Sequence, residues 1–170
     1  MQFTSLEHLQ RYLESNASKI LNNTGIEDVL ADFMSDAVKE VVYENYTPSQ
    51  YIRREDDGGL SDVRNMHITN VEVKGGKVSI LFENLTTGQT SFLPIYNHNL
   101  DSLHGKFISE TIEKGIKDNW YRPDVTDDYG RHPSDPRPFV EETIDMIRRN
   151  PQPLIEAIKR AYKKAGFQVR

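Results

Sequence analysis

The sequence predicts an α+β fold in which N-terminal and C-terminal amphipathic helices pack on a small antiparallel sheet. Apolar residues recur every three or four positions before residue 46 and again after residue 136, as in amphipathic helices. Between residues 70 and 83 they alternate with polar residues, as in strands. Because the helices precede and follow the strands, helices on one face of an antiparallel sheet are favoured over a parallel nucleotide-binding sheet.

Two capping boxes predict the helices of the N-terminal part, residues 1–45. Thr4-Ser5-Leu6-Glu7 predicts a helix start, with the Thr4 hydroxyl as cap and Glu7 reaching back, and this helix ends near Asn22-Asn23. Thr24-Gly25-Ile26-Glu27 predicts a second start, followed by the longest helix, which ends near Asn45.

A loop and antiparallel strands are expected in residues 46–100. Residues 46–65 are rich in turn formers, including Gly58-Gly59, and indicate an exposed loop with a short edge strand at Tyr51–Arg54. Farther along, Gly75-Gly76 separates two alternating runs and predicts a hairpin. A two-residue loop there pairs Lys74 with Lys77, Val73 with Val78, and Val71 with Ile80. A third strand is expected near Ser91–Ile95.

Residues 101–136 predict a short helix, Lys106–Asn119, and then a long polar loop, Tyr121–Pro136. Residues 137–170 predict two C-terminal helices. Pro138 suits the first turn of a helix that runs to Arg149, with an apolar side of Phe139, Val140, Ile144 and Ile147. Asn150 is the expected cap of the last helix, which carries Lys163-Lys164 in its final turn and ends at Gly166. Its expected inner face is Leu154, Ile155, Ile158, Ala161 and Tyr162.

Length and composition bound the class of protein. The chain has 170 residues, enough for one domain, 1–170, and no cysteine, which excludes disulfides and Cys-based metal sites. No apolar run approaches the roughly 20 residues of a membrane helix, so we expect no membrane segment, and no secretory signal. The net charge of -5 argues against a generally basic nucleic-acid binder.

Charge is distributed unevenly along the chain. Residues 1–62 carry 12 acidic and 5 basic side chains, whereas residues 138–170 carry 4 acidic and 7 basic ones. A polybasic C-terminal arm, complementary faces of a self-associating subunit, or simply solvated helix faces would each show this asymmetry.

A search for catalytic or metal-binding patterns gives no site. No phosphate-binding glycine loop, GxSxG elbow or pair of histidines at metal-ligand spacing is present. The Asp-rich cluster lacks EF-hand spacing and is interpreted as solvated loop charge, as is Glu55-Asp56-Asp57. That cluster consists of Asp124, Asp127, Asp128, His132 and Asp135. We therefore expect no enzyme, no cofactor and no metal.

Two stretches resemble the neck and tail-completion proteins of tailed bacteriophages. The first is Tyr51-Ile52-Arg53-Arg54 followed by Gly59-Leu60, which comes between a long amphipathic helix and antiparallel strands. The second is Arg137-Pro138-Phe139-Val140, followed by Thr143 and a terminal helix rich in Lys and Arg. The sequence departs from the family in the spacing between Arg54 and Leu60 and in the Asp-rich insertion before Arg137.

The resemblance implies a structural virion protein of the head–tail junction, assembled in the host cytoplasm. It implies a homo-oligomeric ring, a hexamer or dodecamer, between a connector or head-completion protein and a tail terminator or tail tube protein. Double-stranded DNA would pass through the lumen. The candidate interface residues are Tyr51, Arg53, Arg54, Trp120, Tyr121, Arg137, Phe139, Arg160, Lys163 and Lys164. Trp120 fits an interface and ordinary capping of the core equally well.

Two other functions stay open at the level of sequence. One is a metal-dependent hydrolase or nuclease that uses the Asp-rich loop with His132. The other is a regulatory module whose basic C-terminal tail binds nucleic acid.

Overall fold

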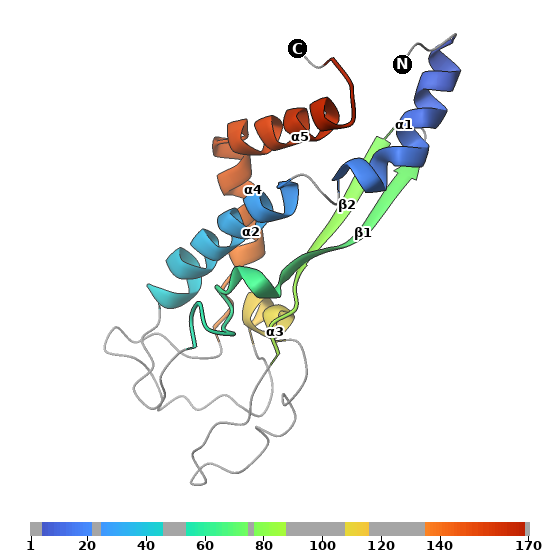
Figure 1. The fold of residues 1–170 in the computed structure, drawn as a ribbon. Helices are drawn as coiled ribbons and strands as arrows, with labels where there is room; N and C mark the ends of the chain where they lie inside the picture. Colours follow the sequence, from blue (N-terminus) through green and yellow to red (C-terminus); the bar gives the residue numbers. More distant parts are fainter. Residues whose placement is uncertain are drawn as a thin grey trace, which may run out of the picture.

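The computed structural model describes residues 5–21, 25–45, 54–74, 77–87, 108–115 and 135–168, and it has the predicted α+β class (Figure 1). Its elements are α1 (Leu6–Leu21), α2 (Ile26–Ala37), the π-helix η1 (Val38–Tyr43), the 3-10 helix η2 (Val63–Asn65), β1 (Met66–Lys74), β2 (Lys77–Asn84), α3 (Ser109–Lys114), α4 (Phe139–Arg149) and α5 (Gln152–Lys164).

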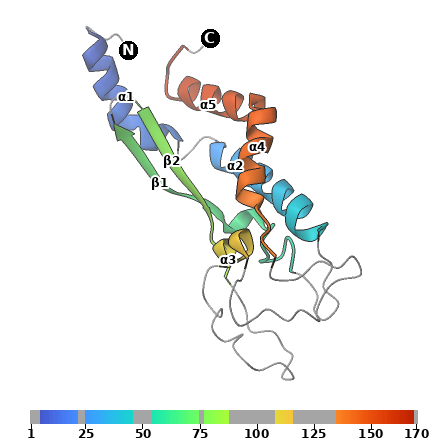
Figure 2. The ribbon, with the colours of Figure 1, turned by 180° about the vertical axis from the view of Figure 1, so that it is seen from behind.

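The elements form a layered body around helix α2. Helix α4 lies behind α2 in Figure 1 and in front of it in Figure 2, so the two helices form separate layers. Strands β1 and β2 extend past them as a long hairpin, with α1 at its tip and α3 at its base (Figures 1 and 2).

The sheet register matches the prediction residue by residue. Strands β1 and β2 pair antiparallel with Lys74 opposite Lys77, Val73 opposite Val78, and Val71 opposite Ile80. An irregularity between Ile68 and Asn70 shifts the register nearer the base of the hairpin. Residues 75–76, the predicted third strand and the predicted edge strand at residues 51–53 lie outside the described residues.

Both predicted capping boxes need correction. Helix α1 begins at Leu6, one residue late, and Ser5 Oγ accepts the N–H of His8 at 3.2 Å; Thr4 lies outside the described residues. Helix α2 follows Gly25 without a side-chain cap. Glu27 does not reach back but accepts the backbone N–H of Ile68 at 2.8 Å, because strand β1 offers it a donor across the fold.

Helix α2 continues to the predicted end, but with a change of pitch. The last turns form η1, in which the Glu44 N–H donates to the Lys39 carbonyl five residues back at 3.0 Å. The Asn45 amide then donates to the carbonyls of Glu40 and Val41, each at 3.1 Å, and satisfies the helix end.

The short predicted helix and the C-terminal helices also differ in detail. Helix α3 covers only Ser109–Lys114 of the predicted range, and residues 106–107 and 116–119 lie outside the described part. Asn150 does not cap α5: Pro151 takes that position, while the Asn150 N–H closes α4 by donating to Met146 at 2.9 Å. A residue before proline is disfavoured in the helical region, which leaves Asn150 between the two helices.

The inward faces of α4 and α5 are narrower than predicted. On α4 the buried residues are Phe139 and Thr143, whereas Val140 and Ile144 are exposed; on α5, Ile155 is exposed and Ala157 is buried. The Thr143 hydroxyl donates to the Phe139 carbonyl at 2.6 Å, so a threonine can face the core without an unpaired polar group. The end of α5 is as predicted, with Gly166 at a φ of 90°.

Two apolar clusters form the core. The first joins α2 and η1 to α4 and the base of the hairpin, with Phe139 as its largest fully buried side chain. The second joins the start of α2 to α5 and the hairpin, where Ile26, Ala157 and Ala161 are buried and the valines and isoleucines of the strands pack against them. Every described element except η2 therefore has apolar residues in one of the clusters or in the groove beside α1.

Candidate functional site

The loop before β1 closes around one buried carboxylate. Asp62 is 3% exposed and accepts the N–H of Gly58 at 2.6 Å and that of Arg64 at 2.9 Å. The Arg64 guanidinium also donates to it, with the shortest contact 2.6 Å. The side-chain hydrogen bonds from Arg64, against the opposing effect of burial, hold the pKa of Asp62 far below its usual range.

Polar side chains from three other elements tie this loop to the fold. The side chains are those of Ser35, Tyr43, Asn84 and Thr86, and we call them, together with residues 54–65, the polar knot. Ser35 donates its hydroxyl to the Ser61 carbonyl at 2.8 Å, and the Asn84 amide donates to Leu60 at 2.7 Å. Tyr43 accepts the Ser61 N–H at 3.1 Å, which connects η1 to the same loop.

The polar knot is a structural platform with its polar groups satisfied. Among the described residues, every buried side-chain nitrogen and oxygen has a hydrogen-bond partner. Buried polar groups that are fully paired rigidify a fold, so these bonds hold the loop in one geometry. The shifted pKa of Asp62 therefore has a structural cause.

The sequence motif in this loop carries a close backbone contact. A Cβ added at Gly59 would lie 2.4 Å from the Glu55 carbonyl oxygen and 2.5 Å from the Glu55 nitrogen, so only glycine fits without a backbone shift. Arg54, two residues before Asp56, is half-buried and donates to the Thr87 carbonyl at 2.8 Å. The Arg54 and Gly59-Leu60 portions of the motif are thus brought together.

The second motif lies at the start of α4. The Arg137 N–H donates to the Ile112 carbonyl at 3.0 Å, and the Phe139 N–H donates to the Arg137 carbonyl at 2.8 Å, so this segment joins α3 to α4. Phe139 itself is fully buried. Its side chain packs in the core of its own subunit and is not available to a neighbouring chain.

Four candidate interface residues lie outside the described residues: Tyr51, Arg53, Trp120 and Tyr121. So do four of the five members of the Asp-rich cluster: Asp124, Asp127, Asp128 and His132. Asp135 is described and exposed. Within the described ranges, no group of three or more potential ligands is placed to hold a metal ion. Of the Glu55-Asp56-Asp57 run, Asp56 contacts Lys39 and Ser61, and Asp57 contacts Arg64.

An acidic groove opens between α2 and the polar knot. Its volume is about 360 Å³, and its lining comprises Asp32, Ser35, Asp36, Lys39, Asp56, Ser61, Asp62, Val63 and Arg64. Four aspartates face two cations there. Asp32 and Asp36 are exposed, and within the described structure neither has an ion-pair or hydrogen-bond partner. The groove therefore keeps uncompensated negative charge at its α2 wall.

Helices α4 and α5 carry exposed apolar and basic side chains. We call these side chains together the C-terminal face: Val140 and Ile144 on α4, and Ile155, Arg160, Lys163 and Lys164 on α5. The arginines of α4 are already paired within the helix, Arg148 with Asp145 at 2.9 Å and Arg149 with Glu142. In the described part of the chain, Arg160 and Lys163 have no such partner.

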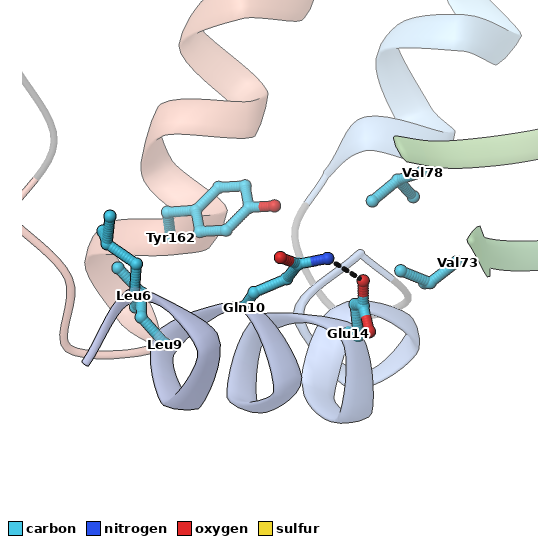
Figure 3. A pocket seen from close by; sticks show the side chains of 7 residues that line it. All are labelled: Leu6, Leu9, Gln10, Glu14, Val73, Val78 and Tyr162. Atoms are coloured by element: carbon cyan, nitrogen blue, oxygen red, sulfur yellow. Dashed lines mark hydrogen bonds between the residues drawn. The ribbon is translucent and has the colours of Figure 1, made fainter. Parts of the chain in front are cut away.

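A second groove, mainly apolar, separates α1 from the hairpin tip and α5. Figure 3 shows Leu6 and Leu9 of α1 near Tyr162 of α5, with Val73 and Val78 on the strand side. The Gln10 amide donates to Glu14 at 2.8 Å along the α1 wall (Figure 3). Tyr12 also contacts Phe167, with ring centroids 5.8 Å apart. Helix α1 therefore contacts the rest of the fold along the sides of this groove.

The sequence did not indicate most of the polar knot or the groove. Asp62 two residues before Arg64 was an available signal, because Asp at such a position accepts local backbone N–H groups in turns. The partners Ser35 and Asn84 lie 26 and 24 residues away from the loop residues they contact, and no sequence period connects them.

Comparisons with known proteins give one family. A protein-family model described as YomN matches residues 5–164. No curated protein and no solved structure matches at a significant level. None of the helices in the described ranges combines the length and apolar character that crossing a membrane requires.

Proposed function

The chain belongs to the YomN family, which derives from bacteriophage, and from this premise we propose that it is a structural protein of the virion neck. In this proposal it forms a homo-oligomeric ring at the head–tail junction. The ring joins a connector or head-completion protein to a tail terminator or tail tube protein, and assembly takes place in the host cytoplasm.

One observation supports this proposal above the others: the subunit carries two different, oppositely charged surfaces. A ring of identical subunits needs a heterologous interface, in which one patch of each subunit binds a different patch of the next. The acidic groove and the C-terminal face share no residue, and each keeps charged side chains without a partner in the described structure.

The polar knot supports a structural role as well. Its buried Asp62 is the carboxylate with the most perturbed pKa in the described residues, and all of its contacts are to its own loop. This carboxylate is engaged by hydrogen bonds from Gly58 and Arg64 that hold the wall of the groove. We therefore propose a function in assembly without enzymatic activity.

The test is assembly of the purified full chain. Sedimentation velocity over a range of concentrations, and negative-stain images with and without connector and tail tube proteins, should show closed rings of uniform diameter that join the two partners. A protein that stays monomeric at high concentration with both partners present would contradict the proposal.

A further inference from the structure

We propose that the C-terminal face of one subunit docks into the acidic groove of a second copy of this chain. The inference rests on the proposed function, because it names the two surfaces that meet where adjacent ring subunits contact each other. It does not depend on which phage proteins lie above or below the ring.

Charge complementarity points to this pairing. Asp32 and Asp36 lie four residues apart and present two carboxylates on one exposed side of α2, at the groove wall. Arg160 and Lys163 lie three residues apart and present two cations on one exposed side of α5. Opposite charges on facing patches orient an encounter and disfavour wrong partners.

The subunit does not satisfy these charges internally. Arg148, Arg149 and Lys159 pair with carboxylates of their own helices, as Lys159 does with Glu156 at 3.5 Å, so none of these three pairs joins α5 to α2. Helix α2 packs against both α4 and α5, yet its acidic side stays exposed. The two surfaces are therefore available to separate neighbours at the same time, which a head-to-tail contact requires.

Exposed apolar residues supply the second component of an interface. On the C-terminal face Val140, Ile144 and Ile155 are 38%, 44% and 39% exposed. At the groove, Val63 is 44% exposed. Protein interfaces combine an apolar centre with a polar rim, and both kinds of exposed side chain are present on the two partners of the proposed docking.

Duplex DNA is the competing occupant of the basic side of α5. Phosphates would match Arg160 and Lys163, but they offer nothing to Val140, Ile144 and Ile155, and they would leave the acidic groove without a role. A second copy of the chain accounts for both surfaces at once.

Charge reversal of each surface provides the experiment. One variant carries Asp32→Lys and Asp36→Lys, and the other carries Arg160→Glu and Lys163→Glu. We expect each variant alone to lose self-association by roughly tenfold or more, because like charges then face each other. A 1:1 mixture should recover assemblies larger than a dimer, because each altered surface finds an opposite charge on the other variant.

A matched control sits at the hairpin tip. Lys74→Glu with Lys77→Glu makes the same change in net charge as the Arg160→Glu, Lys163→Glu variant, at two exposed positions that neither line the acidic groove nor belong to the C-terminal face, and it should assemble like the wild type. All exchanged side chains are exposed, so thermal melts followed by circular dichroism should be nearly unchanged and will separate a lost contact from a lost fold.

The outcomes distinguish the docking from the proposed function. If both charge-reversal variants form rings as well as the wild type does, the docking is overturned and the proposed ring is not. A mixture that stops at a dimer overturns the head-to-tail arrangement. Loss of duplex DNA binding by the Arg160→Glu, Lys163→Glu variant, with assembly unchanged, overturns the assignment of α5 to a second copy. A wild type that never assembles, with its neck partners present, overturns the function itself.

Discussion

The two ends of the subunit are held by different kinds of interaction. At the base of the hairpin, directional hydrogen bonds of the polar knot join α2, η1 and β2 to the loop that contains Asp62 and Ser61. At the tip, apolar side chains of α5 and the strands form the second cluster, and Leu6 and Leu9 of α1 line the groove beside them. The rings of Tyr162 and Phe167 also pack there, with centroids 5.9 Å apart. Hydrogen bonds fix geometry, whereas apolar contacts tolerate small shifts.

Because of this difference, we expect the geometry of the acidic groove, at the base, to be fixed more rigidly than that of the tip. Asp56, Ser61, Asp62 and Arg64 line the groove and also belong to the polar knot. The bonds that hold the loop therefore set the groove wall. We expect changes at the base to cost more free energy of unfolding than comparable changes at the tip.

The largest effect is expected at Phe139, which is fully buried at the base. Phe139→Ala should lower the free energy of unfolding by about 3–5 kcal/mol, because it removes a large apolar side chain and leaves a cavity. Urea titration measures this. Val140→Ala, the exposed neighbour on the same helix, is the control and should change stability by about 0.5 kcal/mol or less.

Substitution of two glycines by alanine separates the effect of a close contact from the effect of a positive φ. Gly59→Ala should cost about 3 kcal/mol or more, because its Cβ would overlap the Glu55 backbone. Gly166→Ala, at the C-terminal end of α5, meets no atom within 4 Å and has only a positive φ, so it should cost about 1 kcal/mol. Equal losses in thermal melts would contradict the contrast between base and tip.

Asp62 gives a pH-dependent prediction. Its pKa is lowered in the folded state, so its contribution to stability is complete above the unfolded pKa of about 3.9 and is lost as pH falls below it. Asp62→Asn should cost about 2 kcal/mol at pH 7, because the charge-assisted bonds to Arg64 disappear. Urea titrations at pH 7, 4 and 3 should show this difference shrinking; a constant difference would contradict the assignment.

The smallest effect is expected at the tip. Ile80 lies opposite Val71 and packs, partly exposed, against the second apolar cluster. Ile80→Val should cost about 1 kcal/mol or less, since the neighbours can close around one lost methylene. A loss as large as that of Gly59→Ala would show that the tip is as tightly fitted as the base.

Elements with a local period could be predicted from the sequence. The hairpin register followed from alternation around Gly75-Gly76, and the end of the helix near Asn45 followed from its apolar stripe, since both depend on neighbours in the chain. The burial of Thr143 in place of Val140 and Ile144 did not follow, because hydrophobicity ranks threonine as a surface residue and overlooks its bond to the Phe139 carbonyl.

Of the candidate site, only the uneven distribution of charge along the chain could be predicted from the sequence. The acidic front and basic end of the chain were visible by counting, and the structure places exposed members of each on α2 and α5. The groove could not be predicted, because Val63 and Asp56 face α2 through long-range contacts such as the bond from Ser35 to Ser61. Contacts between residues distant in the chain leave no period to detect.

The π-helical turns of η1 hold one residue more than an α-helix needs to cover the same rotation. A chain that lacks one residue between Val38 and Tyr43 would therefore pass through this stretch as ordinary α-helix, with nearly the same total rotation. The Tyr43 hydroxyl would then keep its direction toward the Ser61 N–H. Relatives of this chain should accordingly exchange the exposed Glu40 freely, and a relative shorter by one residue here should have α-helix in place of η1.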